Sequence, residues 1–324
     1  MGYCEDSKKI PKEAGILIPF ADLLGTKVEN NRVVIPEQYG KGYVAAFVFN
    51  KHIAMMVNNY ILYEEISYRS QDYNLHKNMI FFKFLNIVSE SEVVAPEEKI
   101  KELPSVLIST MGLNADIVVP SNTRRTQIYI IVDVNYLREL ISSPEKTPVV
   151  QNILKNNQQL LFDQVVSPSL QKVANEIITE EISEPFELFF YRIKAEELVC
   201  RLLSELGKRE EKRIYPLNVQ DIQTLYKVKE HMLKHLDTQI TVDELAQFAN
   251  MSQSKLKRLF KQIFGDSVFS YYQDFKMKEA ARLLKEEKLS VSEVGYRLGF
   301  TNLGHFTRMF EKHIGVKPKR YSMG

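Results

Sequence analysis

Residues 241 to 310 contain one pattern twice, as Thr241-Val-Asp-Glu-Leu-Ala-Gln-Phe-Ala-Asn250 and again as Ser290-Val-Ser-Glu-Val-Gly-Tyr-Arg-Leu-Gly299. A second pair of matching segments follows, Ser252-Gln-Ser-Lys-Leu-Lys-Arg-Leu-Phe260 and Asn302-Leu-Gly-His-Phe-Thr-Arg-Met-Phe310. The offset is 49 residues in the first pair and 50 in the second, which places one inserted residue in the turn between them. Agreement over both segments indicates an internal repeat.

Each copy has the signals of a helix, a tight turn and a second helix. Capping-box pairs open the first helices; they are Thr241 with Glu244 and Ser290 with Glu293. These helices end at Asn250 and Gly299, residues that tolerate a left-handed backbone. The polar residues Ser252 and Asn302 can then cap the helices that follow. Ala246 and Gly295 are small enough for the paired helices to cross closely. The repeat therefore predicts two helix-turn-helix units.

The second helix of each copy has an apolar face and a polar face. The apolar positions are Leu256, Leu259 and Phe260 in the first copy, and Phe306, Met309 and Phe310 in the second. The outward positions are Ser254, Lys257, Arg258 and Lys261 in the first copy, and Gly304, Thr307 and Arg308 in the second. A helix that enters the major groove needs short polar residues and arginine near its N-terminal half, so we expect these faces to meet DNA. In the alternative interpretation, Arg258 and Arg308 form salt bridges within the domain.

The segment between the copies predicts a helix that separates them by a fixed length. Apolar residues recur at helical spacing from Ser267 to about Glu287. About 20 residues at 1.5 Å each span roughly 30 Å, and successive major grooves on one face of DNA lie about 34 Å apart. One chain could therefore place both second helices in adjacent grooves.

Residues 222 to 321 closely resemble the DNA-binding domain of the arabinose-operon regulator (AraC/XylS) family. The matching motifs are Lys276-Met-Lys-Glu-Ala-Ala-Arg-Leu-Leu284, Val291-Ser-Glu-Val-Gly295, Gly299-Phe300, His305-Phe-Thr-Arg-Met-Phe310, Gly315 and Pro318-Lys-Arg-Tyr321. The resemblance implies a bacterial transcription factor that binds double-stranded DNA through a domain of seven helices. Members of this family are usually activators, which would make RNA polymerase a partner.

Carried onto this chain, the resemblance implies recognition helices at residues 252–264 and 302–314. The groove-facing positions would be Ser254, Lys257 and Arg258 in the first, and Leu303, Gly304, Thr307 and Arg308 in the second. Ser252 and Asn302 would meet phosphates, and Lys261 is a further candidate for phosphate contact. Because Leu303 and Gly304 lack the polar side chains that many relatives carry, we expect the second helix to depend more on backbone contacts or DNA shape.

A charged segment with a glycine, Gly207-Lys-Arg-Glu-Glu-Lys-Arg213, interrupts the apolar pattern before Pro216. It predicts a sensor or dimerisation domain at 1–206, a linker at 207–215 and a DNA-binding domain at 216–324. Residues 216–324 contain 18 basic and 12 acidic residues, a net charge of +6, which leaves −4 for residues 1–215. A basic C-terminal third favours an anionic partner there.

The N-terminal domain reads as strands followed by helices, so the whole chain is of the α+β class. Runs of β-branched and aromatic residues predict an antiparallel β sandwich or barrel; they are residues 33–35, 43–49, 52–57, 60–68, 79–88, 106–110 and 127–132. Helices are predicted at 133–140, 149–161, 168–181 and 185–206. The last helix has a wide apolar stripe that must be covered by the sheet or by a second copy of the chain, so we expect a homodimer.

The family often senses a small molecule with its N-terminal domain, and a pocket here would be lined by Phe47, Phe49, Met55, Phe82 and Phe84. An ordinary sheet core explains the same residues. The alternative function is therefore a ligand-independent regulator whose N-terminal domain only dimerises or binds a protein partner. The sequence names no ligand.

No catalytic motif is present, so we expect no enzyme, no cofactor and no metal. His52 and His76 are isolated, and His231 and His235 lack a third ligand nearby. The chain of 324 residues has two cysteines and no apolar run of about 18 residues. A cytoplasmic protein that does not span a membrane is the expectation.

Overall fold

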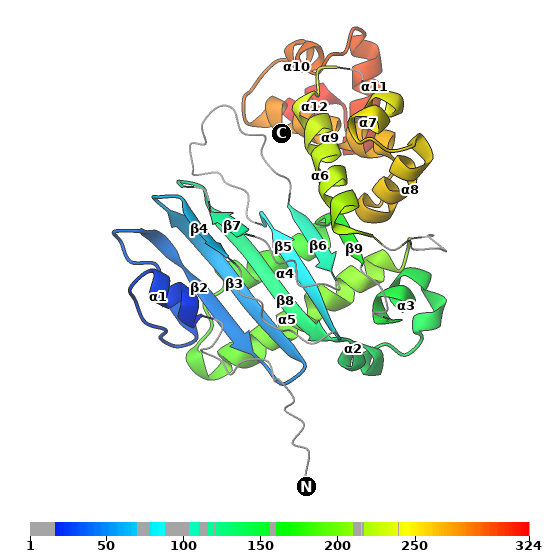
Figure 1. Ribbon diagram of the computed structural model, residues 1–324. Coiled ribbons are helices and arrows are strands. Elements are labelled where there is room, and N and C mark those ends of the chain that lie inside the picture. Colours follow the sequence, from blue (N-terminus) through cyan, green and yellow to red (C-terminus); the bar gives the residue numbers. More distant parts are fainter. Residues whose placement is uncertain are drawn as a thin grey trace. The chain divides into compact units, whose positions relative to one another are not determined.

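The computed structural model describes residues 17–69, 78–87, 104–109, 116–119, 121–155, 160–209, 215, 217–238 and 240–323. Contacts within the chain divide it into unit 1, Met1–Pro216, and unit 2, Leu217–Gly324. In the described residues, all strands belong to unit 1, and unit 2 is helical (Figure 1). No helix among these residues is both long enough and apolar enough to cross a lipid bilayer.

Unit 1 is built on an antiparallel sheet of seven strands in the order β1-β2-β3-β8-β5-β6-β9. The strands are β1 (Arg32–Val34), β2 (Gly40–Val48), β3 (Ile53–Leu62), β8 (Arg125–Asp133), β5 (Met79–Leu85), β6 (Ser105–Ser109) and β9 (Leu161–Val165). A smaller antiparallel pair is formed by β4 (Ile66–Arg69) and β7 (Asp116–Val119). The predicted antiparallel β-rich domain, followed by a helical domain, is confirmed.

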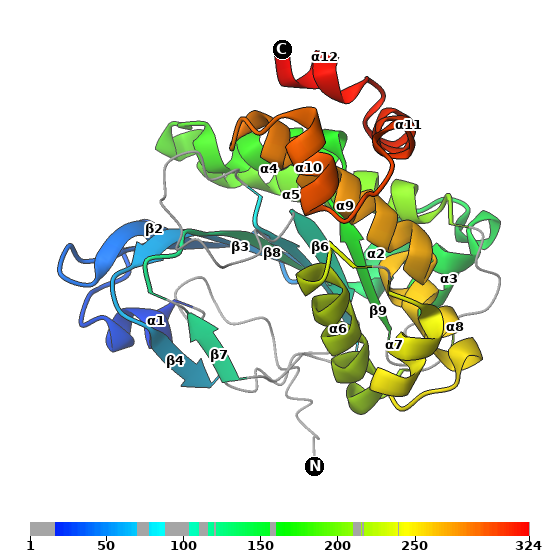
Figure 2. The same ribbon diagram turned by 90° about the horizontal axis from the view of Figure 1, so that it is seen from above.

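One face of the large sheet is apolar and is covered by helices. The register places Phe47 opposite Met55 and Met55 opposite Ile130, so large side chains form a row across the central strands. Two helices, α4 (Pro168–Thr179) and α5 (Glu184–Leu206), lie over this face (Figure 2). Their buried residues join the same apolar core. α1 (Ile18–Leu23) packs on the opposite face.

Short helices after β8 border the same core. α2 (Val134–Leu140) begins at Asp133, whose carboxylate accepts hydrogen bonds from the backbone N–H groups of Asn135 and Tyr136. The helix predicted at 133–140 is therefore present, and Asp133 caps it. A 3₁₀ turn, η1 (Pro144–Lys146), and α3 (Pro148–Lys155) follow.

The predicted helix at 149–161 is too long. α3 ends at Lys155, and Leu161–Val165 forms the edge strand β9 instead. Phe162 pairs with Ile108 of β6 in the register. Helical periodicity alone missed this strand, because its partner lies more than 50 residues away in the sequence.

Unit 2 consists of seven helices in its described residues. They are α6 (Val219–Lys234), α7 (Val242–Phe248), α8 (Gln253–Phe264), α9 (Val268–Lys285), α10 (Val291–Arg297), α11 (Leu303–Ile314) and α12 (Pro318–Met323). α9 packs against α6, α8, α10, α11 and α12. The side chains of Phe306 and Phe310 are fully buried beside Met277 and Leu284 of α9, as predicted for core residues.

Candidate nucleic-acid interface

Both predicted capping boxes are present and open the first helix of each unit. The backbone N–H of Thr241 donates to Glu244 Oε2 at 2.8 Å, and Glu244 N–H donates to Thr241 Oγ1 at 3.2 Å. Ser290 and Glu293 repeat this exchange at 2.8 and 3.3 Å. The Thr241 backbone bond lowers the pKa of Glu244, and bonds from the Ser290 side chain and backbone lower the pKa of Glu293. Both boxes are therefore stabilised by ionised glutamates.

Both turns use the left-handed backbone that the sequence predicted. Asn250 has φ of 49° and Gly299 has φ of 71°. At Gly299 the approach is also close, because a Cβ there would lie 1.8 Å from the carbonyl oxygen of Asp237. A Cβ at Gly295 would lie 2.5 Å from Leu303 Cδ2, which confirms that a small residue lets α10 and α11 cross closely.

α8 presents a continuous polar and basic surface. Its cap Ser252 accepts a hydrogen bond from Lys255 N–H at 3.3 Å. The side chains predicted to face DNA are all exposed; they are Ser252, Ser254, Lys257, Arg258 and Lys261. The apolar face of α8, with Leu256, Leu259 and Phe260, is buried. α8 contains no acidic residue, so all the charges on its outward face are positive.

α11 presents a weaker version of this surface. Asn302 caps it by accepting a hydrogen bond from His305 N–H at 3.0 Å. Gly304 and Arg308 are exposed, whereas Leu303 and Thr307 are half-buried. Glu311 occupies the position that corresponds to Lys261 in α8, so the two helices differ in charge as well as in side-chain chemistry.

The structure adds two features that the sequence analysis did not contain. Lys255 is on α8, but its ammonium pairs with Asp221 of α6 at 2.8 Å, which ties the helix to the domain. His305 is exposed in the first turn of α11, beside the predicted groove-facing residues. The repeat places His305 at the position equivalent to Lys255, and this equivalence could have identified His305 from the sequence.

The length of α9 agrees with the predicted spacer. Its 18 residues correspond to about 27 Å of helix. Lys276 is buried in α9, with its ammonium 4.9 Å from the ring of Phe300, and burial lowers its pKa. The hydroxyl of Tyr272 shares its one proton between the carbonyl oxygens of His235 and Thr238, at 2.8 and 2.7 Å. α9 is thus fixed to the turn before the first helix-turn-helix unit.

In unit 1, the five residues predicted to line a ligand pocket lie in the core beneath the helices. Phe47, Met55, Phe82 and Phe84 are almost fully buried, and Phe49 is partly buried against them. The ring of Phe47 lies 4.2 Å from that of Tyr191 in α5, centroid to centroid. Their role in ligand binding stays a prediction.

The opposite face of the three central strands contains polar residues that the sequence analysis missed. In the register Asn58 lies opposite Gln127, and Lys83 lies opposite Tyr129. Asn58 Oδ1 is buried and has no hydrogen-bond partner among the described residues. Burial lowers the pKa of Lys83. These residues alternate with apolar neighbours along the strands, and this alternation could have identified them from the sequence.

The described residues contain no group of three or more His, Cys, Asp and Glu side chains that could hold a metal ion. The rings of His231 and His235 lie 4.6 Å apart, and His231 stacks on Phe248 at 4.6 Å. His52 stacks on Tyr136 at 5.4 Å. His76 lies outside the described residues.

Comparison with known proteins places residues 245–323 in a helix-turn-helix domain family. The probable transcription factor PqrA of Proteus vulgaris is 31% identical over 96 residues, which cover 28% of this chain and 79% of PqrA. The arabinose operon regulatory protein of Escherichia coli K12 is 31% identical over 96 residues, which cover 29% of this chain and 33% of that protein. The chain belongs to the AraC/XylS family of helix-turn-helix transcriptional regulators.

The matched domain family covers residues 245–323, in the C-terminal part of the chain. The chain spans only 25% to 34% of the length of the first curated relatives. Among solved structures, the DNA-binding domain of AdpA in complex with a target DNA is 30% identical and covers 31% of this chain and 90% of that chain, with a TM-score of 0.30.

Proposed function

We propose that this protein is a sequence-specific DNA-binding transcriptional regulator that places α8 and α11 in adjacent major grooves. The observation that carries the proposal is the pair of capped helix-turn-helix units joined by the rigid helix α9. Each unit buries the apolar side of its second helix and exposes the polar side. This is the arrangement that a recognition helix needs.

In this proposal α8 supplies most of the base contacts and phosphate affinity. Arg258 reads a base edge, with Ser254 and Lys257 beside it. Lys261 and the N-terminal end of α8 at Ser252 meet phosphates. α8 itself carries no acidic side chain that would repel the DNA backbone.

α11 reads fewer bases. Arg308 and Thr307 are its polar groove-facing side chains, while Gly304 and Leu303 allow backbone or apolar contact. Glu311 faces solvent where α8 has Lys261, and a carboxylate opposes close phosphate contact. α11 therefore depends more on phosphate contacts near Asn302 and on DNA shape.

Arg258→Ala in the full-length protein tests the base-reading role. If Arg258 reads a base, specific affinity falls by about 1–3 kcal/mol while affinity for random DNA changes less. Lys227→Ala removes one exposed positive charge from α6 and is the matched control. Fluorescence anisotropy measures the affinity for specific and for random DNA, and the ratio of these two affinities gives the specificity. If the ratio is equal for Arg258→Ala, Lys227→Ala and the unaltered protein, Arg258 does not read a base.

We also propose that unit 1 controls this activity through a small-molecule effector. The sensor role rests on family membership, and the alternative is a ligand-independent unit 1 that only dimerises or binds a protein. A thermal-shift screen of metabolites on the full chain separates the two. A saturable shift supports the sensor, and no shift with any compound supports the alternative.

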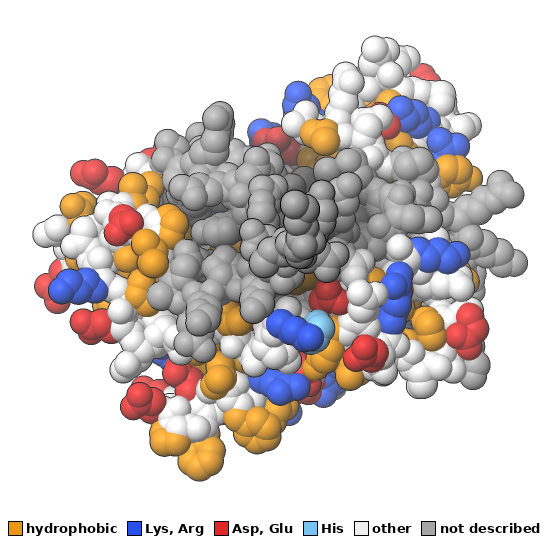
Figure 3. Space-filling model, turned by 60° about the horizontal axis from the view of Figure 1, so that its bottom comes forward, with side chains coloured by type: hydrophobic (Ala, Val, Ile, Leu, Met, Phe, Trp, Pro, Cys, Tyr) orange, Lys and Arg blue, Asp and Glu red, His pale blue; other side chains and the backbone are white. Residues whose placement is uncertain are grey.

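Dimerisation through α5 completes the proposal. Its N-terminal half exposes Phe186, Phe189 and Ile193 to extents of 63%, 66% and 46%. Their spacing of three and four residues places them on one helix face. Figure 3 shows several groups of exposed hydrophobic side chains on the side of the molecule that it draws. Because a second copy of α5 offers the same apolar stripe, we infer a homodimer.

The dimer is tested by sedimentation of the full-length protein. Phe189→Asp should yield monomers at concentrations where the unaltered protein is dimeric. Tyr39→Asp changes another exposed aromatic residue of unit 1 and should leave the dimer intact. A dimer that survives Phe189→Asp would place the interface elsewhere.

Activation through RNA polymerase is the mode of regulation that we propose from the family. The named relatives are regulators, so a non-enzymatic protein without a cofactor is part of the same proposal. A regulator of chromosomal genes acts where the chromosome is, which in bacteria is the cytoplasm.

A further inference from the structure

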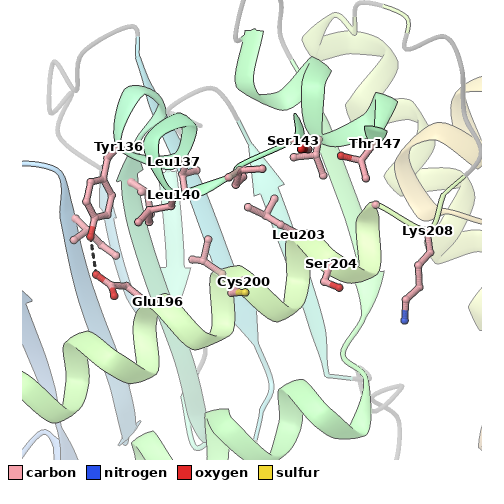
Figure 4. Close-up of a pocket in the computed structure, with 16 residues that line it drawn as sticks. Tyr136, Leu137, Leu140, Ser143, Thr147, Glu196, Cys200, Leu203, Ser204 and Lys208 are labelled. Atoms are coloured by element: carbon pink, nitrogen blue, oxygen red, sulfur yellow. Dashed lines mark hydrogen bonds between the residues drawn. The ribbon is translucent and has the colours of Figure 1, made fainter. Parts of the chain in front are cut away.

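A cavity of about 470 Å³ lies in unit 1 between α2, the segment leading to α3, and the C-terminal half of α5 (Figure 4). This volume falls in the range of small-molecule sites, roughly 300–1,000 Å³. None of the five residues that the sequence analysis proposed for ligand binding lines it. The cavity is therefore a separate candidate site.

The walls of the cavity are mainly apolar. They are formed by Ile53, Val132, Leu137, Val150, Val199 and Leu203. Leu140 lines the cavity and is 57% exposed. An apolar ligand body that covered Leu140 would remove this surface from water, and this burial would favour binding.

Polar groups lie at the two ends of the cavity. Figure 4 shows Tyr136 and Glu196 at one end and Lys208 at the other, with Cys200 between them. Ser204 lies on the Lys208 side of Cys200. An apolar wall with a few polar groups at its ends suits an amphipathic ligand.

The charges at the two ends are not equally compensated. Glu196 Oε1 accepts hydrogen bonds from Tyr136 Oη at 2.7 Å and from Arg192 Nε at 3.1 Å. Its charge is thus already matched by a guanidinium. Lys208 is exposed and has no ion pair among the residues that the structure describes. The unmatched charge of the cavity is therefore positive.

We propose that this cavity binds a small amphipathic carboxylate, with its apolar body against Leu203 and Leu140 and its carboxylate on the Lys208 ammonium. The charge-assisted contact with Lys208 selects the acid over an uncharged analogue. This inference rests on the proposed effector control and names its ligand class and site. Lys208 lies two residues beyond the end of α5 at Leu206, and unit 2 begins at Leu217, so the ligand would stabilise the last turn before the connection to unit 2.

Cys200 provides a direct readout of occupancy. Its thiol is free, exposed and part of the cavity lining. In full-length protein carrying Cys4→Ser, Cys200 is the only thiol left in the sequence. Its rate of reaction with a chromogenic disulfide is measured with phenylacetate, phenylbutyrate and decanoate, each compared with its uncharged amide.

At about ten times its dissociation constant, an acid that fills the cavity should slow the reaction by roughly tenfold, and its amide should protect less. Lys208→Gln should make acid and amide protect equally. Leu140→Ser, at an exposed position, should weaken protection by both. Lys41→Gln, an exposed lysine outside the cavity, should leave the difference intact.

Absence of protection by all three acids, or an undiminished preference for acid in Lys208→Gln, would overturn the proposal. The thiol assay contains no DNA. A failure of this inference is therefore distinguishable from a failure of DNA binding, which is measured on the same protein by anisotropy.

Discussion

Replacing Gly299 by alanine tests the close packing that positions α11. The Gly299 backbone is left-handed, with φ of 71°, which costs an L-residue about 1–2 kcal/mol. The new Cβ would lie 1.8 Å from the Asp237 carbonyl oxygen, so the 235–238 turn must move. That movement threatens the hydrogen bond of Tyr272, whose single hydroxyl proton is shared between the carbonyl oxygens of His235 and Thr238 and contributes about 0.5–1.5 kcal/mol. Together with the backbone cost, we expect a total loss of about 1.5–3.5 kcal/mol.

Gly315→Ala is the matched control for Gly299→Ala. Gly315 has φ of 86°, but a Cβ added there would have nothing within 4 Å, so only the backbone cost of about 1–2 kcal/mol applies. Urea unfolding of the full-length variants gives the loss of stability, and peptide-resolved hydrogen exchange assigns it to unit 2. Equal losses for both variants would refute the close approach of Gly299 to Asp237.

Three further predictions concern charge. Lys261→Ala should reduce the slope of log affinity against log salt concentration by about one, measured by anisotropy, and an unchanged slope would place Lys261 in solvent. Lys83→Met should raise the stability of unit 1 by roughly 1 kcal/mol in urea unfolding, because it removes a partly buried charge that has no ion pair among the described residues; lower stability would show that the contact of its ammonium with the Tyr129 ring, 5.8 Å from the centroid, outweighs the cost of burial. The pKa values of Glu244 and Glu293 are lowered in the folded state, so their stabilisation is present above the ordinary glutamate pKa and is lost as pH falls below it. In the double variant Glu244→Gln/Glu293→Gln, unit 2 should therefore lose less stability on acidification than in the unaltered protein, as measured by urea midpoints. An equal loss in both proteins would contradict this.

Unit 2 could be predicted in detail because its signals are local. Each capping box depends on residues three apart, and each turn depends on the backbone freedom of one residue. Asn250 and Gly299 therefore identified the turns correctly from the sequence alone. Because the pattern occurs twice, each predicted cap and turn was supported by two copies of the repeat.

Contacts between distant residues could not be predicted in this way. Lys255 and Asp221 are 34 residues apart, and only the packing of α8 on α6 brings them to 2.8 Å. The strand at Leu161–Val165 depends on the free edge of β6, which no local pattern reveals. The cavity beside Lys208 combines α2, the segment before α3 and α5, so its lining could not be read from one segment.

The candidate DNA-facing residues were predictable because amphipathic spacing separates the two sides of a helix. The buried Leu256 and Phe260 leave Lys257 and Arg258 outward, as the sequence indicated. Leu303 shows the limit of this reasoning. Its half-buried side chain lies against Gly295, a contact set by the crossing of α10 and α11.

Recognition of DNA by two helices is tested most directly by capturing fragments of the source genome with the purified full-length protein, sequencing them and footprinting the recovered site. We predict a recurrent site with two short protected segments about 10 base pairs apart, one for each recognition helix. Arg258→Ala should weaken one segment and Arg308→Ala the other. A single protected segment that is indifferent to Arg308→Ala, or no enriched site either with the full-length protein or with residues 216–324, would contradict recognition by two helices.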